Sequence, residues 1–199
     1  MNSLLYFNIV PNKFKKMKTL KNKIIVVMPS IIDPLFSKTL IYIVKHDNNG
    51  TSGLIINKKV NSNKHFFDSK NNEDANLMKL SNHLFLGGPV ISKNFIVIHP
   101  SIYNSPDSLL ISKNISITNI DSFFLKKIQS KKNIKHKIII GYSGWSPGQI
   151  EKEISQGDWL AYKGTNKLIF NKDSRTSWAK VIKSIGIDNV ANGNFGALA

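Results

Sequence analysis

Gly141-Tyr-Ser-Gly-Trp-Ser-Pro-Gly-Gln-Ile-Glu-Lys-Glu-Ile154 is the most informative segment of this chain. It follows the apolar run Ile138–Ile140, which predicts a buried strand. The tetrapeptide Ser146–Gln149 combines an N-cap serine, a proline at the first helical position and a glutamine three residues after the cap. We therefore expect a tight strand-to-helix junction, a helix that begins within a residue or two of Pro147 with the serine as its cap, and a buried Trp145.

Apolar runs on both sides of this stretch predict the other elements. Strands are expected at 24–28, 39–46, 54–57, 84–86, 95–98, 109–111, 115–117, 159–162 and 168–170. Asp47-Asn-Asn-Gly50 predicts a hairpin turn, because Asn and Gly accept positive φ. Helices are expected at 73–80, at 121–130 and from a cap at Asp173 or Ser174 to Gly186, with Trp178, Val181, Ile182 and Ile185 on one apolar face. Strands early and helices mainly late indicate an α+β fold.

The length of 199 residues predicts one domain at 19–199, preceded by a flexible basic extension at 1–18. No apolar run approaches the ~18–20 residues of a membrane helix, and the sequence contains no cysteine. We therefore expect a cytoplasmic protein without membrane contact or disulfides. None of the five histidines lies three to five residues from another, so no helix-borne metal pair is expected, and no cofactor either.

The formal net charge of +16 raises the question of a nucleic-acid partner. Lysine supplies almost all of the positive charge, and Arg175 is the only arginine. The planar arginine fork reads guanine edges, so its scarcity argues against a sequence-specific DNA reader. Lysines spread over a solvated surface are the favoured interpretation. Non-specific nucleic-acid binding is the alternative, and it would require one contiguous lysine face.

Two glycine-rich turns, Gly87-Gly-Pro89 and Gly141–Gln149, contribute most of the candidate binding residues. Glycines there can bring backbone N–H groups toward a ligand, although tight turns and close packing are their commoner roles. The candidates for ligand or partner binding are Gly87, Gly88, Pro89, His99, Tyr142, Ser143, Trp145, Gln149 and Glu151. We expect an unknown protein or a small molecule as the partner. A small-ligand receptor or enzyme with a pocket between the two turns remains an alternative.

Catalytic roles for these candidates have less support than structural ones. Gly141 to Gly144 resembles a nucleophile elbow, but Trp145 stands where that motif needs glycine, which argues against Ser143 as a nucleophile. Glu151 and Glu153 are two residues apart on the expected helix, so they point away from each other and complement its dipole. His99 follows a strand and is expected to hydrogen-bond a turn. No catalytic residue is therefore assigned.

The order of many short motifs resembles a known family. They are Met28-Pro29, Asp33-Pro34, Phe36, His46-Asp47, Gly50, Gly53-Leu-Ile-Ile-Asn57, Gly87-Gly-Pro-Val90, Phe95, His99, Gly141-Tyr-Ser-Gly-Trp145, Gly148-Gln-Ile-Glu151, Glu153, Trp159-Leu160, Phe170, Trp178 and Gly186-Ile-Asp188. This set resembles the AlgH/YqgE family of small bacterial proteins from about Thr19 to the C-terminus. Two departures are Lys45, where members usually carry an acid, and a C-terminus without the common Gly-His-Ala ending. The segments 1–18 and 58–80 lie outside the match.

The resemblance implies both a fold and a class of function. The fold is a single α+β domain whose bent, partly split mixed or antiparallel β-sheet curls toward a pseudo-barrel with flanking helices. One member is named as a regulator of alginate synthesis, which implies a link to transcriptional regulation. We therefore expect a non-catalytic binding or regulatory protein that acts through contacts around the two glycine-rich turns.

Overall fold

The computed structural model describes residues 19–60, 84–120, 130, 134–171 and 173–187, without the side chains of 92–94. The expected extension at 1–18 and helix at 73–80 lie outside these residues, as does the helix at 121–130 except for Ser130. No helix in the described part is long and apolar enough to cross a bilayer.

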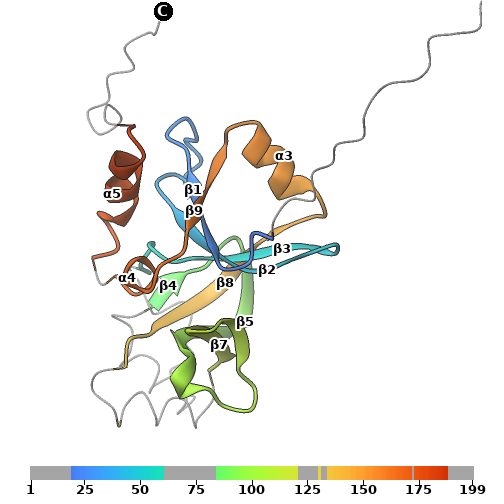
Figure 1. Cartoon of the computed structure of the whole chain (residues 1–199), viewed down its shortest axis with the longest axis vertical. Helices are drawn as coiled ribbons and strands as arrows, with labels where there is room; N and C mark the ends of the chain where they lie inside the picture. Colours follow the sequence, from blue (N-terminus) through green and yellow to red (C-terminus); the bar gives the residue numbers. More distant parts are fainter. Residues whose placement is uncertain (1–18, 61–83, 121–129, 131–133, 172, 188–199) are drawn as a thin grey trace, which may run out of the picture.

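In the described residues, nine strands form one curled sheet (Figure 1). The strands are β1 (Lys23–Val27), β2 (Leu40–Asp47), β3 (Gly50–Ile55), β4 (Leu84–Leu86), β5 (Val90–Pro100), β6 (Leu109–Ser112), β7 (Ile115–Asn119), β8 (Lys137–Trp145) and β9 (Trp159–Lys163). Their order is β6-β7-β5-β8-β3-β2-β1-β9, with β4 beside β8. Among these described strands, all pairs are antiparallel except β4 with β8. The expected α+β class and the curled, mostly antiparallel sheet are therefore confirmed.

Short helices border this sheet. They are η2 (Ser101–Tyr103), α3 (Gln149–Ser155), α4 (Asn166–Ile169) and α5 (Ser177–Ser184). In the view of Figure 1, α3 and α5 stand on opposite sides of the β1–β9 pair. Trp178 of α5 is buried and donates its Nε1 hydrogen to the backbone oxygen of Val27 at 2.9 Å, which fastens this helix to β1.

The core consists mainly of branched aliphatic side chains from the sheet. Ile24 to Val27 are all buried, as expected of a strand covered on both faces. A second, smaller cluster forms around Leu84, Phe95 and Ile138. The predicted hairpin between β2 and β3 is confirmed, with Asp47 opposite Gly50.

The strand before the expected junction is longer than predicted. β8 runs without interruption from Lys137 through the glycines to Trp145. Residues 138–140 pair with β4 on one edge, while residues 143–145 pair with β3. Gly141 lies between these two pairings with φ 75°, a left-handed conformation that glycine adopts without steric cost. The strand therefore bends and changes partners at Gly141 instead of ending there, which produces the split of the sheet.

Two further expectations are wrong. The segment 168–170 was expected as a strand, but α4 covers most of it, because the Thr165 side chain accepts the Leu168 N–H and caps a helical turn. Neither Asp173 nor Ser174 caps α5, which begins at Ser177. The Asp173 carboxylate instead accepts the Thr176 hydroxyl at 2.5 Å.

Lys137, the first residue of β8, places an amino group inside the apolar interior. Its exposed fraction is 3%, its Nζ donates to the Ile56 backbone oxygen, and it lies 4.2 Å from the centre of the Phe85 ring. Burial, helped by the nearby positive charge of Lys59, lowers the pKa of Lys137 to about 7. Protonation of Lys137 is therefore less favourable in the folded protein than in the unfolded chain, and it lowers the free energy of unfolding.

Lys137→Met should reveal this cost as a pH-dependent difference in stability. Between the folded pKa of about 7 and the ordinary value of 10.5, the unfolded wild type binds one more proton than the folded wild type, so its stability rises with pH. The free-energy advantage of the variant should therefore shrink by up to about 1.4 kcal/mol per pH unit from about pH 7 to about pH 10. Urea unfolding across this range measures it, with the exposed Lys135→Met as a control that shows no such trend. An advantage that stays constant with pH would contradict the buried, weakly basic lysine.

Candidate functional site

The two glycine-rich segments are in direct contact. The Gly87 N–H donates to the Ile140 oxygen at 2.8 Å, and the Ser143 hydroxyl donates to the Gly87 oxygen at 3.2 Å. A Cβ on Gly87 would lie 2.2 Å from the Gly141 oxygen, and one on Gly88 would lie 2.3 Å from the Tyr142 carbonyl carbon. Only glycine allows this approach. We call this contact of Gly87-Gly88 with Gly141–Ser143 the glycine crossing; backbone atoms fill it, so a ligand can approach only its outer rim.

The rim of the glycine crossing is apolar and open to solvent. Val90 and Ile91 expose 42% and 54% of their surface, and Pro89 is exposed beside them. Val90 pairs with Tyr142 across β5 and β8, and Tyr142 is half-buried. Pro89 and Tyr142 are therefore the sequence candidates that this rim presents to a partner.

A second group of candidates meets at the Glu153 carboxylate on α3. Oε2 of Glu153 accepts the indole N–H groups of Trp145 and Trp159, both at 2.8 Å. The two rings meet edge to face with centroids 6.0 Å apart, and Gln149 donates to the other Glu153 oxygen at 2.9 Å. Trp145 is buried, as predicted. The sequence showed the residues but not this shared bond, because their meeting depends on the packing of α3 over β8 and β9.

The cap of α3 differs from the expected one. The helix begins at Gln149, within the predicted distance of Pro147, but its N-cap is Gly148 with φ 75°. The Ser146 side chain makes no capping bond; its backbone N–H donates to the Gln149 side-chain oxygen at 3.0 Å. The glutamine half of the predicted capping box therefore forms at the expected residues, while the N-cap lies two residues later than expected, at the left-handed Gly148.

Glu151 reaches β2 and fixes His46. The two side chains approach to 2.8 Å through His46 Nε2, while His46 Nδ1 accepts the backbone N–H of Leu20 at 3.0 Å. The Nδ1 atom therefore carries no proton in the neutral ring, and Nε2 donates to the carboxylate. Glu151 and Glu153 point to different strands, as their spacing predicts. The family resemblance drew attention to His46, but no sequence spacing connected it with a residue 105 positions away.

His99 belongs to a different set of contacts. It is fully buried, its Nε2 lies 2.7 Å from the Thr118 hydroxyl, and its Nδ1 lies 3.0 Å from the Pro100 oxygen. The Thr118 hydroxyl continues this chain to Ser108 at 2.7 Å. The sequence candidates thus divide among the glycine crossing, the α3 contacts and the β5–β7 pair rather than forming one site.

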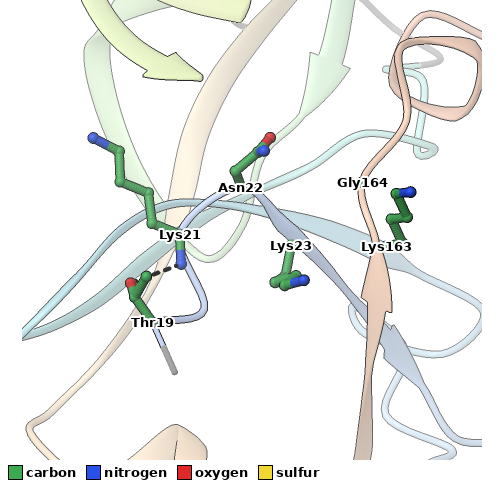
Figure 2. Close-up of a pocket in the computed structure, with 6 residues that line it drawn as sticks. All are labelled: Thr19, Lys21, Asn22, Lys23, Lys163 and Gly164. Carbon is green, nitrogen blue, oxygen red and sulfur yellow. Dashed lines mark hydrogen bonds between the residues drawn. The ribbon is translucent and has the colours of Figure 1, made fainter. Parts of the chain in front are cut away.

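A pocket that sequence reasoning missed opens between the start of β1 and the end of β9 (Figure 2). Its volume is about 360 Å³, and its lining residues are Thr19, Lys21, Asn22, Lys23, Lys163 and Gly164. Lys23 and Lys163 are direct partners across the two antiparallel strands. We call this feature the lysine pocket. Strand register alone brings these lysines together, so only a correct pairing of β1 with β9 could have predicted it.

Comparisons with known proteins agree on one family. A family model described as AlgH-like matches residues 24–190. A protein of Buchnera aphidicola subsp. Baizongia pistaciae is 33% identical over 85% of this chain and 92% of its own length, and one of Aliivibrio fischeri (strain MJ11) is 34% identical over 87% and 95%. Both carry the name UPF0301 protein.

Two solved structures show the same fold. The solution structure of the AlgH protein from Pseudomonas aeruginosa has a TM-score of 0.67 at 23% identity and covers 96% of this chain and 99% of its own. A crystal structure of a Corynebacterium diphtheriae protein has a TM-score of 0.64 at 18% identity, with 86% and 91% covered.

Ser146 and Gln149 should differ in their effect on stability. Ser146→Ala should change the free energy of unfolding by less than about 0.5 kcal/mol, because the hydroxyl caps nothing. Gln149→Ala should cost about 1 kcal/mol, because it removes the acceptor for the Ser146 N–H and the donor to Glu153. Urea unfolding of both variants measures the difference. A larger loss for Ser146→Ala than for Gln149→Ala would restore the serine cap.

Glu153→Ala should be among the more damaging changes on α3. It leaves the buried indole N–H groups of Trp145 and Trp159 without their acceptor, at a cost of about 2–4 kcal/mol in all. Glu153→Gln retains an oxygen acceptor and should cost less. Urea unfolding followed by tryptophan fluorescence measures both, and a Glu153→Ala midpoint equal to that of wild type would contradict the shared bond.

Proposed function

Because this chain belongs to the AlgH-like family, we propose that it is a cytoplasmic binding and regulatory protein whose partner docks on the rim of the glycine crossing. The partner is a protein segment with apolar side chains. The action is binding, without turnover of a substrate. The observation that carries this proposal is the exposure of Val90 and Ile91 directly beside the glycine crossing.

The side chains of His46 and Ser143 support binding over catalysis because the fold already uses their polar atoms. Both ring nitrogens of His46 are engaged, one by a backbone N–H and the other by Glu151. Ser143 is 1% exposed, and its hydroxyl donates to the Gly87 backbone oxygen. A proton transfer by His46 would have to break one of these contacts first, and a nucleophilic Ser143 would have to leave its buried position.

The rim itself has the properties of a small recognition surface. Its side chains project from two backbone segments that pack too closely for a Cβ to fit between them. Because these segments are already ordered, little further ordering is required when a partner binds. Its aliphatic and aromatic side chains supply apolar surface whose burial against a partner is favourable. The resemblance to a family with a member named as a regulator supports a regulatory outcome of such binding.

Cross-linking and affinity measurements together test the proposal. A photo-cross-linking amino acid at position 90 should trap a partner in growing cells, whereas the same residue at position 102 should not, although Ile102 is 83% exposed. The purified partner should then bind Ile91→Asp at least about tenfold more weakly than wild type, a loss of about 1.4 kcal/mol. Ile102→Asp is the matched control and should bind as wild type does.

Two outcomes would overturn the proposal. One is equal affinity of the trapped partner for wild type and Ile91→Asp. The other is turnover, in a broad screen of hydrolase, phosphatase and oxidoreductase substrates, that Glu151→Gln abolishes.

A further inference from the structure

We propose that the lysine pocket binds a phosphate group of a nucleotide, either free or within a single-stranded nucleic acid. The site is separate from the rim of the glycine crossing, and the inference does not depend on the function proposed above. It stands on the register of β1 and β9, on the donors that line the pocket and on the backbone that holds them (Figure 2).

Lys23 and Lys163 form a like-charge pair. They lie directly opposite each other on adjacent antiparallel strands, an arrangement that places the Cβ atoms about 5 Å apart and destabilises a sheet. Both side chains are exposed, and within the described residues neither has an ion pair or side-chain hydrogen bond. A phosphate between the two ammonium groups would turn this repulsion into attraction.

Two other surface lysines, unlike Lys23 and Lys163, lie beside a carboxylate. Lys45 lies 3.4 Å from the Asp47 carboxylate, and Lys180 lies 3.5 Å from Asp173. No acidic residue is among the six that line the lysine pocket. The local charge there is therefore uncompensated by the lining, in contrast to those two paired positions.

The other lining side chains add neutral donors. Thr19 Oγ1 accepts the Lys21 backbone N–H at 3.2 Å, which leaves the hydroxyl hydrogen free to donate. Asn22 Oδ1 accepts the hydroxyl of buried Tyr42 at 2.9 Å, so the Asn22 NH₂ group is the part left for a ligand. Burial raises the pKa of Tyr42, which keeps that hydroxyl protonated as the donor. Ammonium, hydroxyl and amide donors around one cavity suit an anion rather than a cation.

Lys21 contributes charge at the edge of the lysine pocket. Its Nζ donates to the Leu110 oxygen of β6 at 3.2 Å, and Figure 2 shows its side chain directed away from Lys23. An ammonium group has three donors, so this bond leaves two. Lys21 is therefore a secondary contributor, and the Lys23–Lys163 pair provides the main contact.

The backbone around the pocket is held in an unusual geometry. Asn22 has φ 66°, a left-handed conformation that is uncommon outside glycine, and its N–H donates to the Ile43 oxygen at 2.9 Å. A Cβ on Gly164 would lie 2.7 Å from the Asn22 oxygen, so glycine is required for the two walls to meet. Such a locally constrained residue at a cavity is a common property of ligand sites.

Isothermal titration calorimetry with three probes tests the inference. The probes are pyrophosphate, ATP and an oligothymidylate of about 12 nucleotides, each at about 50 and about 200 mM salt. Lys23→Met/Lys163→Met should weaken binding of whichever probe binds by at least about tenfold. Lys113→Met/Lys152→Met also removes two positive charges, but from exposed positions outside the pocket. It should change the affinity by less than about twofold.

The probes distinguish the sources of the phosphate. Binding of pyrophosphate or ATP would identify a free phosphorylated ligand, and binding of the oligonucleotide alone would identify nucleic acid; both support the inference. Thermal unfolding should show that the Lys23/Lys163 variant is folded and, without ligand, at least as stable as wild type. Saturation by none of the probes, or equal weakening in both double variants, would overturn the inference.

Discussion

The change of pairing partners along β8 at Gly141 sets the geometry of the whole sheet. One edge of this strand pairs first with β4 and then with β3, and the transition requires a residue that accepts positive φ. Gly87-Gly88 then packs against the same bend of β8 at distances that exclude any Cβ. Because packing of backbone on backbone leaves no room for adjustment, the two halves of the sheet have one relative orientation.

That orientation determines where the signature residues point. Beyond Gly141, β8 places Trp145 against Trp159, and Glu153 on α3 joins them. From the same helix, Glu151 reaches His46 on β2. A seven-residue helix thus connects three strands through two carboxylates, which accounts for acids at alternate positions better than a dipole effect alone. The segment that first suggested a functional site is, in its buried part, the joint of the fold.

Local patterns in the sequence predicted the sheet well and the side-chain contacts poorly. Continuous apolar runs identified β1 and β8, and Asn-Asn-Gly identified the hairpin, because burial and positive φ leave a local signature. α4 was missed because its apolar residues Leu168 to Phe170 fit a strand and only the Thr165 cap indicates a helix. The His46–Glu151 contact and the lysine pair have no local signature at all, since each depends on long-range packing or register.

The high net charge acquires meaning only when each lysine is placed. A charge of +16 by itself supports solubility and weak attraction to polyanions, and it says nothing about a site. Placed on the fold, lysines fall into different physical situations: Lys45 and Lys180 are beside acids, Lys137 is buried, and Lys23 is paired with Lys163 across β1 and β9. The first situation is nearly neutral for stability and the second costs free energy that buried packing must offset. The Lys23–Lys163 pair is also unfavourable in the free protein, but a bound anion can relieve its repulsion. Strand register, rather than total charge, therefore identifies the β1–β9 edge as the candidate anion site.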